Sequence, residues 1–77
     1  MFTFVSITNC QRCFTILHKR GEEVTMRKVH FCKSLRAAKS YAGFCRDEHE
    51  IVEVFNEHKV RVAHKCFVNG KQKWLAN

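Results

Sequence analysis

Hydrophobic and polar positions alternate along several stretches of the chain, which is the pattern of half-buried β-strands. The stretches are rich in β-branched and aromatic residues and are separated by polar or glycine-containing connections. They cover residues 2–8, 13–18, 23–31, 50–55 and 59–68. The pattern therefore predicts a protein built mainly from β-strands.

The third stretch changes its alternation part-way along. Val24 and Met26 share one parity, whereas Val29 and Phe31 share the other. One extra residue in a strand re-aims the side chains that follow it. We therefore predict a β-bulge near residues 27–28.

Between the third and fourth strands the apolar spacing becomes helical. Ser34 is a favourable N-cap, and the spacing predicts a helix over residues 34–46. Gly43 weakens its last turn by about 1 kcal/mol relative to alanine. The apolar stripe consists of Leu35, Ala38, Ala42 and Cys45, widened by Ala37, Tyr41 and Phe44.

The dipeptide Asn69-Gly70 is the strongest turn signal in the chain. Asparagine and glycine readily take the positive φ angles that a two-residue type I′ hairpin requires. Such a hairpin pairs Val68 with Lys71 and places Lys65 opposite Trp74.

These elements predict the order βββαβββ in a single domain, residues 1–77. The fold class is α+β: a curled antiparallel sheet of five to six strands packed on one α-helix. We expect the sheet face that points away from the helix to be solvated and basic.

Charge is the most informative feature of the composition. The chain has 14 basic and 7 acidic residues among 77, and a formal net charge of +7. Most of the acids fall within residues 47–57, and residues 58–77 contain none. Such a surface attracts polyanions or an acidic protein patch.

Basic residues near aromatic ones are the best candidates for a binding site, because they suit phosphate contact and stacking on a base. The alternative is that the charges only keep the protein in solution and that Trp74 belongs to the core. The candidates on the C-terminal hairpin are Arg61, Lys65, Lys71, Lys73 and Trp74, followed by Arg36 and Lys39 on the helix.

The cysteines permit a second interpretation. Cys10 and Cys13 form a C-x-x-C pair between two predicted strands, and His30 and Cys32 complete a conceivable set of four zinc ligands. Five cysteines without a disulfide spacing indicate free thiols in a reducing compartment. We expect no cofactor, and a zinc-stabilised module remains the third alternative.

Catalytic and membrane signals are missing from the sequence. It contains no phosphate-binding loop, dinucleotide-binding fingerprint or H-E-x-x-H zinc motif, and no recognisable nucleophile motif. No apolar run approaches the roughly 20 residues of a transmembrane helix, and the first residues are a poor secretory signal. We expect a non-enzymatic cytoplasmic protein that does not bind membranes.

Two segments resemble known proteins: Ser34 to Ala42, with its S-L-x-x-A-K pattern, and Val68 to Trp74, whose N-G-x-x-x-W spacing is similar to an N-G-x-x-W hairpin. They resemble small phage-encoded accessory proteins, in particular anti-CRISPR inhibitors of type I effector complexes. The resemblance covers the C-terminal half and implies a viral protein that inhibits or redirects a host protein or nucleoprotein complex. The alternative is a stand-alone domain that binds DNA or RNA through phosphate contacts.

Overall fold

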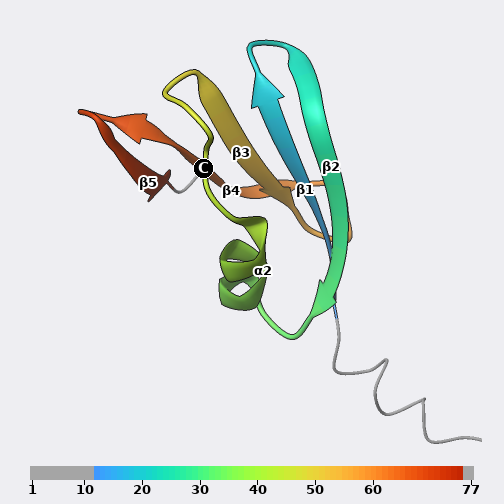
Figure 1. The fold of residues 1–77 in the computed structure, drawn as a ribbon. Coiled ribbons are helices and arrows are strands. Elements are labelled where there is room, and N and C mark those ends of the chain that lie inside the picture. Colours follow the sequence, from blue (N-terminus) through green and yellow to red (C-terminus); the bar gives the residue numbers. More distant parts are fainter. Residues whose placement is uncertain (1–11, 76–77) are drawn as a thin grey trace, which may run out of the picture.

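The computed structural model describes residues 12–75 as five strands and one helix in the order ββαβββ (Figure 1). The predicted strand at residues 2–8 lies outside the described residues. The elements are β1 (Arg12–Arg20), β2 (Glu23–Cys32), α2 (Leu35–Ala42), β3 (Glu50–Phe55), β4 (Arg61–Val68) and β5 (Lys71–Leu75).

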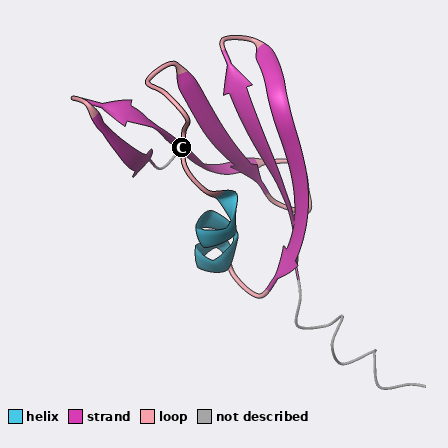
Figure 2. Ribbon diagram, viewed as in Figure 1, coloured by secondary structure: helices cyan, strands magenta, loops and turns pink. Residues whose placement is uncertain are grey.

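The strands form one antiparallel sheet with the order β2-β1-β3-β4-β5. Strand β1 is therefore hydrogen-bonded on both sides, and β2 and β5 are the edges of the described sheet. The chain crosses from β2 to β3 through α2, which lies against one face of the sheet (Figures 1 and 2). The predicted α+β class is confirmed, whereas residues 12–75 supply five strands and not six.

The core lies between α2 and the sheet face that it covers. Alternation along β1 places Phe14 and Ile16 on this face, and both are almost fully buried. Val52 and Val54 of β3 lie beside them with no exposed surface. The helix contributes small side chains, which allow its backbone to approach the sheet closely.

The helix is shorter than the sequence predicted. Ser34 is its N-cap, as expected: the Ser34 hydroxyl accepts a hydrogen bond of 3.2 Å from the Ala37 amide. However, the helix ends at Ala42 and not at residue 46, because Gly43 adopts a φ of 85°. Glycine takes this conformation without the penalty that a Cβ brings, so Gly43 terminates the helix instead of merely weakening it.

Removal of the N-cap is expected to destabilise the protein moderately. Ser34→Ala leaves the Ala37 amide without its side-chain acceptor, which costs about 1 kcal/mol. Urea denaturation followed by circular dichroism measures this loss. Ser40→Ala, an exposed position in the same helix, is the control and is expected to stay within about 0.5 kcal/mol of the native protein.

The β-bulge occurs in β2, but nearer its start than predicted. His18 pairs with Met26 and Lys19 pairs with Val24, so Thr25 is the extra residue. The Thr25 hydroxyl donates a hydrogen bond of 3.2 Å to the His18 carbonyl, which holds the irregularity in place. The prediction of an extra residue was correct, and its position at 27–28 was wrong.

The C-terminal hairpin follows the prediction. Asn69 and Gly70 have φ angles of 54° and 80°, as a type I′ turn requires. Val68 pairs with Lys71, and Lys65 lies opposite Trp74. In Figure 1 this hairpin extends away from the centre of the sheet, to the left of α2.

The sheet face that points away from α2, called here the back face, is not simply solvated and basic. It exposes apolar side chains: Val29 is 51% exposed, Phe31 59% and Ile51 36%. The alternation predicted that these residues belong to strands, but it did not predict that they are exposed. Nothing among residues 12–75 covers them.

Candidate functional site

A groove lies where α2 and the segment that follows it face the β4–β5 hairpin. Its volume is about 360 Å³. It brings together four of the residues predicted from the sequence: the cations Arg36, Lys39 and Lys65, and Trp74. The complete lining is Arg36, Lys39, Ser40, Gly43, Phe44, Lys65 and Trp74. We call it the helix groove.

Cations and aromatic rings alternate in the helix groove. The Lys65 ammonium lies 4.8 Å from the ring centroid of Trp74 and 4.8 Å from that of Phe44. The Lys39 ammonium lies 5.4 Å from the Trp74 centroid. Distances below about 6 Å are those of cation–π contacts. The Phe44 side chain is 76% exposed, so most of its surface is available to a ligand.

Lys65 has a structural role in addition to its charge. Its residue is only 8% exposed, and its ammonium donates a hydrogen bond of 3.0 Å to the Gly43 carbonyl. A cation at the C-terminus of a helix satisfies the carbonyl groups that have no partner within the helix. Lys65 therefore fixes the end of α2 against the hairpin.

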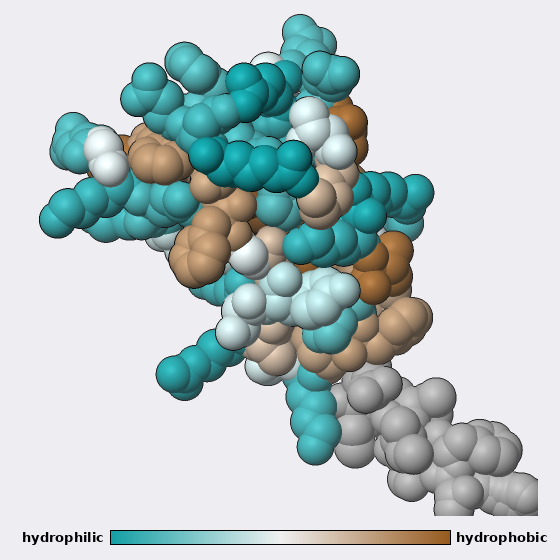
Figure 3. Space-filling model, viewed as in Figure 1, coloured by the Kyte–Doolittle hydropathy of each residue, from teal (hydrophilic) through white to brown (hydrophobic). Residues whose placement is uncertain are grey.

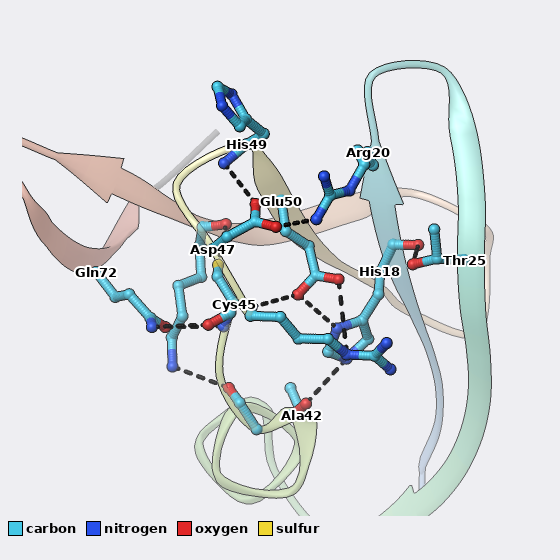
Figure 4. A network of polar contacts seen from close by, with 12 residues as sticks. His18, Arg20, Thr25, Ala42, Cys45, Asp47, His49, Glu50 and Gln72 are labelled. Atoms are coloured by element: carbon cyan, nitrogen blue, oxygen red, sulfur yellow. Dashed lines mark hydrogen bonds and ion pairs between the residues drawn. The ribbon is translucent and has the colours of Figure 1, made fainter.

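The segment after the helix is tied to β5 by Gln72. The Cys45 amide donates to the Gln72 side-chain oxygen at 2.8 Å, and the Gln72 side-chain nitrogen donates back to the Cys45 carbonyl at 2.9 Å (Figure 4). This reciprocal pair holds the segment that carries Phe44 against the hairpin. Phe44 is thus presented at the groove by backbone geometry and not by burial of its own side chain.

A buried polar network holds the C-terminal end of α2, next to the groove residues Gly43 and Phe44 (Figure 4). The Ala42 carbonyl accepts hydrogen bonds from the His18 ring at 3.1 Å and from the Lys28 ammonium at 3.2 Å. The other ring nitrogen of His18 lies 3.5 Å from the Glu50 carboxylate, which also accepts a hydrogen bond of 2.7 Å from the Arg46 amide. His18 and Glu50 are 3% and 2% exposed, so this network is part of the core.

The other predicted binding residues lie elsewhere. Lys73 pairs with Cys66, one position out of phase with Lys65 and Trp74, so Lys71 and Lys73 lie on the back face. Arg61 is also on that face and donates a hydrogen bond of 2.8 Å to the Glu53 carboxylate. The expectation of one basic patch on the hairpin was therefore wrong: alternation divides the cations between two faces.

The proposed zinc ligands do not converge. Cys13 lies on the back face, opposite Phe31, whereas His30 and Cys32 face the helix. The His30 ring stacks on Tyr41 with a centroid distance of 3.8 Å, and the Cys32 thiol donates to the Ser34 carbonyl at 3.3 Å. Cys10 is outside the described residues. Among residues 12–75, Cys13 therefore lies on the opposite face of the sheet from His30 and Cys32, which does not favour the alternative of a zinc site.

The predicted apolar stripe of the helix wrongly included two aromatic residues. Tyr41 is 47% exposed and Phe44 is 76% exposed, although both were expected to widen the apolar side of the helix. The signal that identifies Phe44 was Gly43: once the helix ends there, Phe44 leaves the helical stripe. For Tyr41, the sequence gives no comparable signal.

The Cys45 thiol is not prepared for nucleophilic attack. It is 4% exposed and lies 3.5 Å from the Lys65 carbonyl, to which it donates. Burial raises the pKa of this thiol, and the nearby Glu50 carboxylate raises it further. The thiol is therefore protonated at neutral pH, where only the thiolate is reactive.

The surface seen in Figure 3 is mixed, with hydrophobic side chains bordered by hydrophilic ones. No helix within residues 12–75 is long and apolar enough to cross a membrane. Comparisons with protein-family models, curated proteins and solved structures found no match. The resemblance to anti-CRISPR inhibitors therefore stays a prediction.

Proposed function

We propose that this protein is a non-enzymatic binding protein that holds single-stranded nucleic acid in the helix groove. One observation carries the proposal: the exposed Phe44 ring and the half-buried Trp74 ring lie among the cations Arg36, Lys39 and Lys65 in a single concavity. Aromatic platforms beside basic side chains are the recurrent means of binding a single strand.

The dimensions of the groove favour a single strand over a duplex. Its volume of about 360 Å³ lies at the low end of the range for small-ligand pockets, about 300–1,000 Å³. We infer that it accepts one nucleotide and not the width of a double helix. A base in a duplex is stacked and paired, so its ring face is not available to Phe44. In a single strand the base can stack on Phe44 while Arg36 and Lys39 contact the flanking phosphates.

Binding of this kind is consistent with a wider role in a viral setting. We propose that the protein inhibits or redirects a host nucleoprotein complex by occupying its exposed single strand. The resemblance of Ser34 to Ala42 and Val68 to Trp74 to phage inhibitors supports this role, as does the net charge of +7. Contact with nucleic acid outside a host complex is the narrower claim and can be tested first.

Replacement of Phe44 by alanine tests the stacking contact. Loss of one base–aromatic stack costs about 1–3 kcal/mol, so affinity for a labelled oligothymidylate is expected to fall about 5- to 150-fold. Because Phe44 is largely exposed, its removal leaves the core unchanged. Fluorescence anisotropy measures the affinity, and circular dichroism verifies the fold.

Phe31→Ala is the matched control, since Phe31 is also exposed but lies on the back face. This variant is expected to bind oligothymidylate as the native protein does. Equal affinities of the two variants would contradict stacking in the helix groove. Failure of the native protein to bind any single strand, at low salt, would reject the proposed function itself.

A further inference from the structure

A second groove lies on the back face, separate from the helix groove. Its volume is about 410 Å³. It shares no lining residue with the helix groove. The lining comprises Thr15, Leu17, Val24, Arg27, Phe55 and Lys59. We call it the back groove.

The floor of the back groove is apolar and belongs to a wider apolar surface. Leu17 and Phe55 come from the adjacent strands β1 and β3, and Val24 on β2 is 48% exposed. Val29 and Phe31 continue this surface along β2. Exposed apolar surface that polar residues surround is typical of protein interaction sites.

Two cations lie at the rim of this apolar floor, Arg27 from β2 and Lys59 from the turn before β4. Within residues 12–75, neither forms an ion pair with a carboxylate. Glu53, a carboxylate of β3 on this face, is already engaged by Lys19 at 3.5 Å and by Arg61 at 2.8 Å. Glu57, in the same turn as Lys59, is paired with Arg12 at 3.5 Å. Arg27 and Lys59 therefore lie at the back groove without a carboxylate partner among residues 12–75.

Lys59 is held in an unusual conformation. Its φ is 65°, in the left-handed region, which costs a residue with a Cβ about 1–2 kcal/mol. Asn56 maintains this turn: its carbonyl accepts from the Lys59 amide at 3.0 Å, and its side chain accepts from the amides of His58 and Val60 at 2.8 Å and 3.1 Å. Backbone strain of this kind concentrates at functional sites.

We propose that the back groove is the docking site for a segment of a partner protein in which apolar side chains are flanked by carboxylates. The apolar side chains lie over Leu17, Val24 and Phe55, and the carboxylates pair with Arg27 and Lys59. This proposal is independent of nucleic-acid binding, because the two grooves lie on opposite sides of the sheet.

Charge distinguishes this occupant from the alternatives. A second copy would bring another net charge of +7 and another Arg27 and Lys59 to the same surface, and like charges at an interface disfavour it. Residues 1–11 of the chain itself contain no carboxylate to pair with the two cations. A nucleic acid supplies phosphates but no aliphatic side chain for the apolar floor. An acidic, apolar protein segment satisfies both features.

Selection from a random peptide display library against the immobilised full-length protein tests the proposal. Recovered peptides are expected to be enriched in aliphatic or aromatic residues next to aspartate or glutamate. One recovered peptide is then synthesised with a fluorescent label, and its affinity is measured by anisotropy. The double variant Arg27→Glu, Lys59→Glu is expected to weaken binding by about tenfold or more.

Two variants with the same change in charge serve as controls. Lys71→Glu with Lys73→Glu alters the back face at β5, far along the sheet order from β2, and Arg36→Glu with Lys39→Glu alters the helix groove. Both are expected to bind the peptide within about twofold of the native protein. Circular dichroism verifies that every variant is folded.

Three results would overturn the proposal. The first is a set of recovered peptides without acidic enrichment, or no recovered peptide. The second is a peptide whose binding is abolished in the helix-groove variant and retained in the Arg27 and Lys59 variant. The third is a dimer of the native protein in analytical ultracentrifugation that Val24→Asp abolishes, because this would assign the back groove to a second copy.

Discussion

Replacing Arg36 and Lys39 together by glutamate is expected to weaken the binding of oligothymidylate about a hundredfold or more. Each side chain lines the helix groove beside the aromatic rings. Removal of one charge-assisted hydrogen bond costs about 1.5–3 kcal/mol, so the removal of two exceeds about 3 kcal/mol. The dependence on salt changes as well: the slope of log K against log salt concentration becomes shallower by about 0.7 for each phosphate that the variant no longer neutralises.

The double variant Lys71→Glu, Lys73→Glu is the decisive control. It carries the same change in net charge and alters the hairpin cations that the sequence placed in the same patch. Because these side chains lie on the back face, we expect a smaller effect, confined to long-range electrostatics and absent at high salt. A larger loss of affinity in this variant than in the helix variant would restore the hairpin patch as the binding surface.

The sequence predicted the hairpin well because its signals were local. Asn69-Gly70 determines its own turn, and the turn determines the register that sets Lys65 opposite Trp74. The same register implies that Lys71 and Lys73 point away from Trp74, since neighbouring positions in a strand face opposite sides. The predicted patch grouped residues that lie close in the sequence and overlooked this alternation.

The rest of the site depended on contacts that no local pattern contains. The position of Phe44 results from the end of the helix at Gly43 and from the pairing of Cys45 with Gln72, which are 27 residues apart. The exposure of apolar side chains on the back face could not be predicted from a local pattern either. Alternation predicts that two sets of side chains exist, but not which set α2 covers. That choice is made when the chain crosses from β2 to β3.

Replacing Glu50 by alanine is expected to destabilise the protein by about 1–3 kcal/mol for each buried donor that loses its acceptor. The Glu50 carboxylate is 2% exposed and accepts from the Arg46 amide, and it lies 3.5 Å from the His18 ring. Small domains have a total stability of about 5–15 kcal/mol, so this loss is a large part of it. The network also fixes the Ala42 carbonyl, so the helix groove is expected to lose its shape before the sheet unfolds.

Urea denaturation followed by the fluorescence of Trp74, the single tryptophan, measures this effect. Glu48→Ala is the matched control: its side chain is 73% exposed in the same loop, and we expect a change within about 0.5 kcal/mol. Glu50→Gln separates shape from charge, because the amide oxygen still accepts from the Arg46 amide while the negative charge beside His18 is removed. Equal stabilities of the Glu50→Ala and Glu48→Ala variants would mean that the buried network does not support the groove.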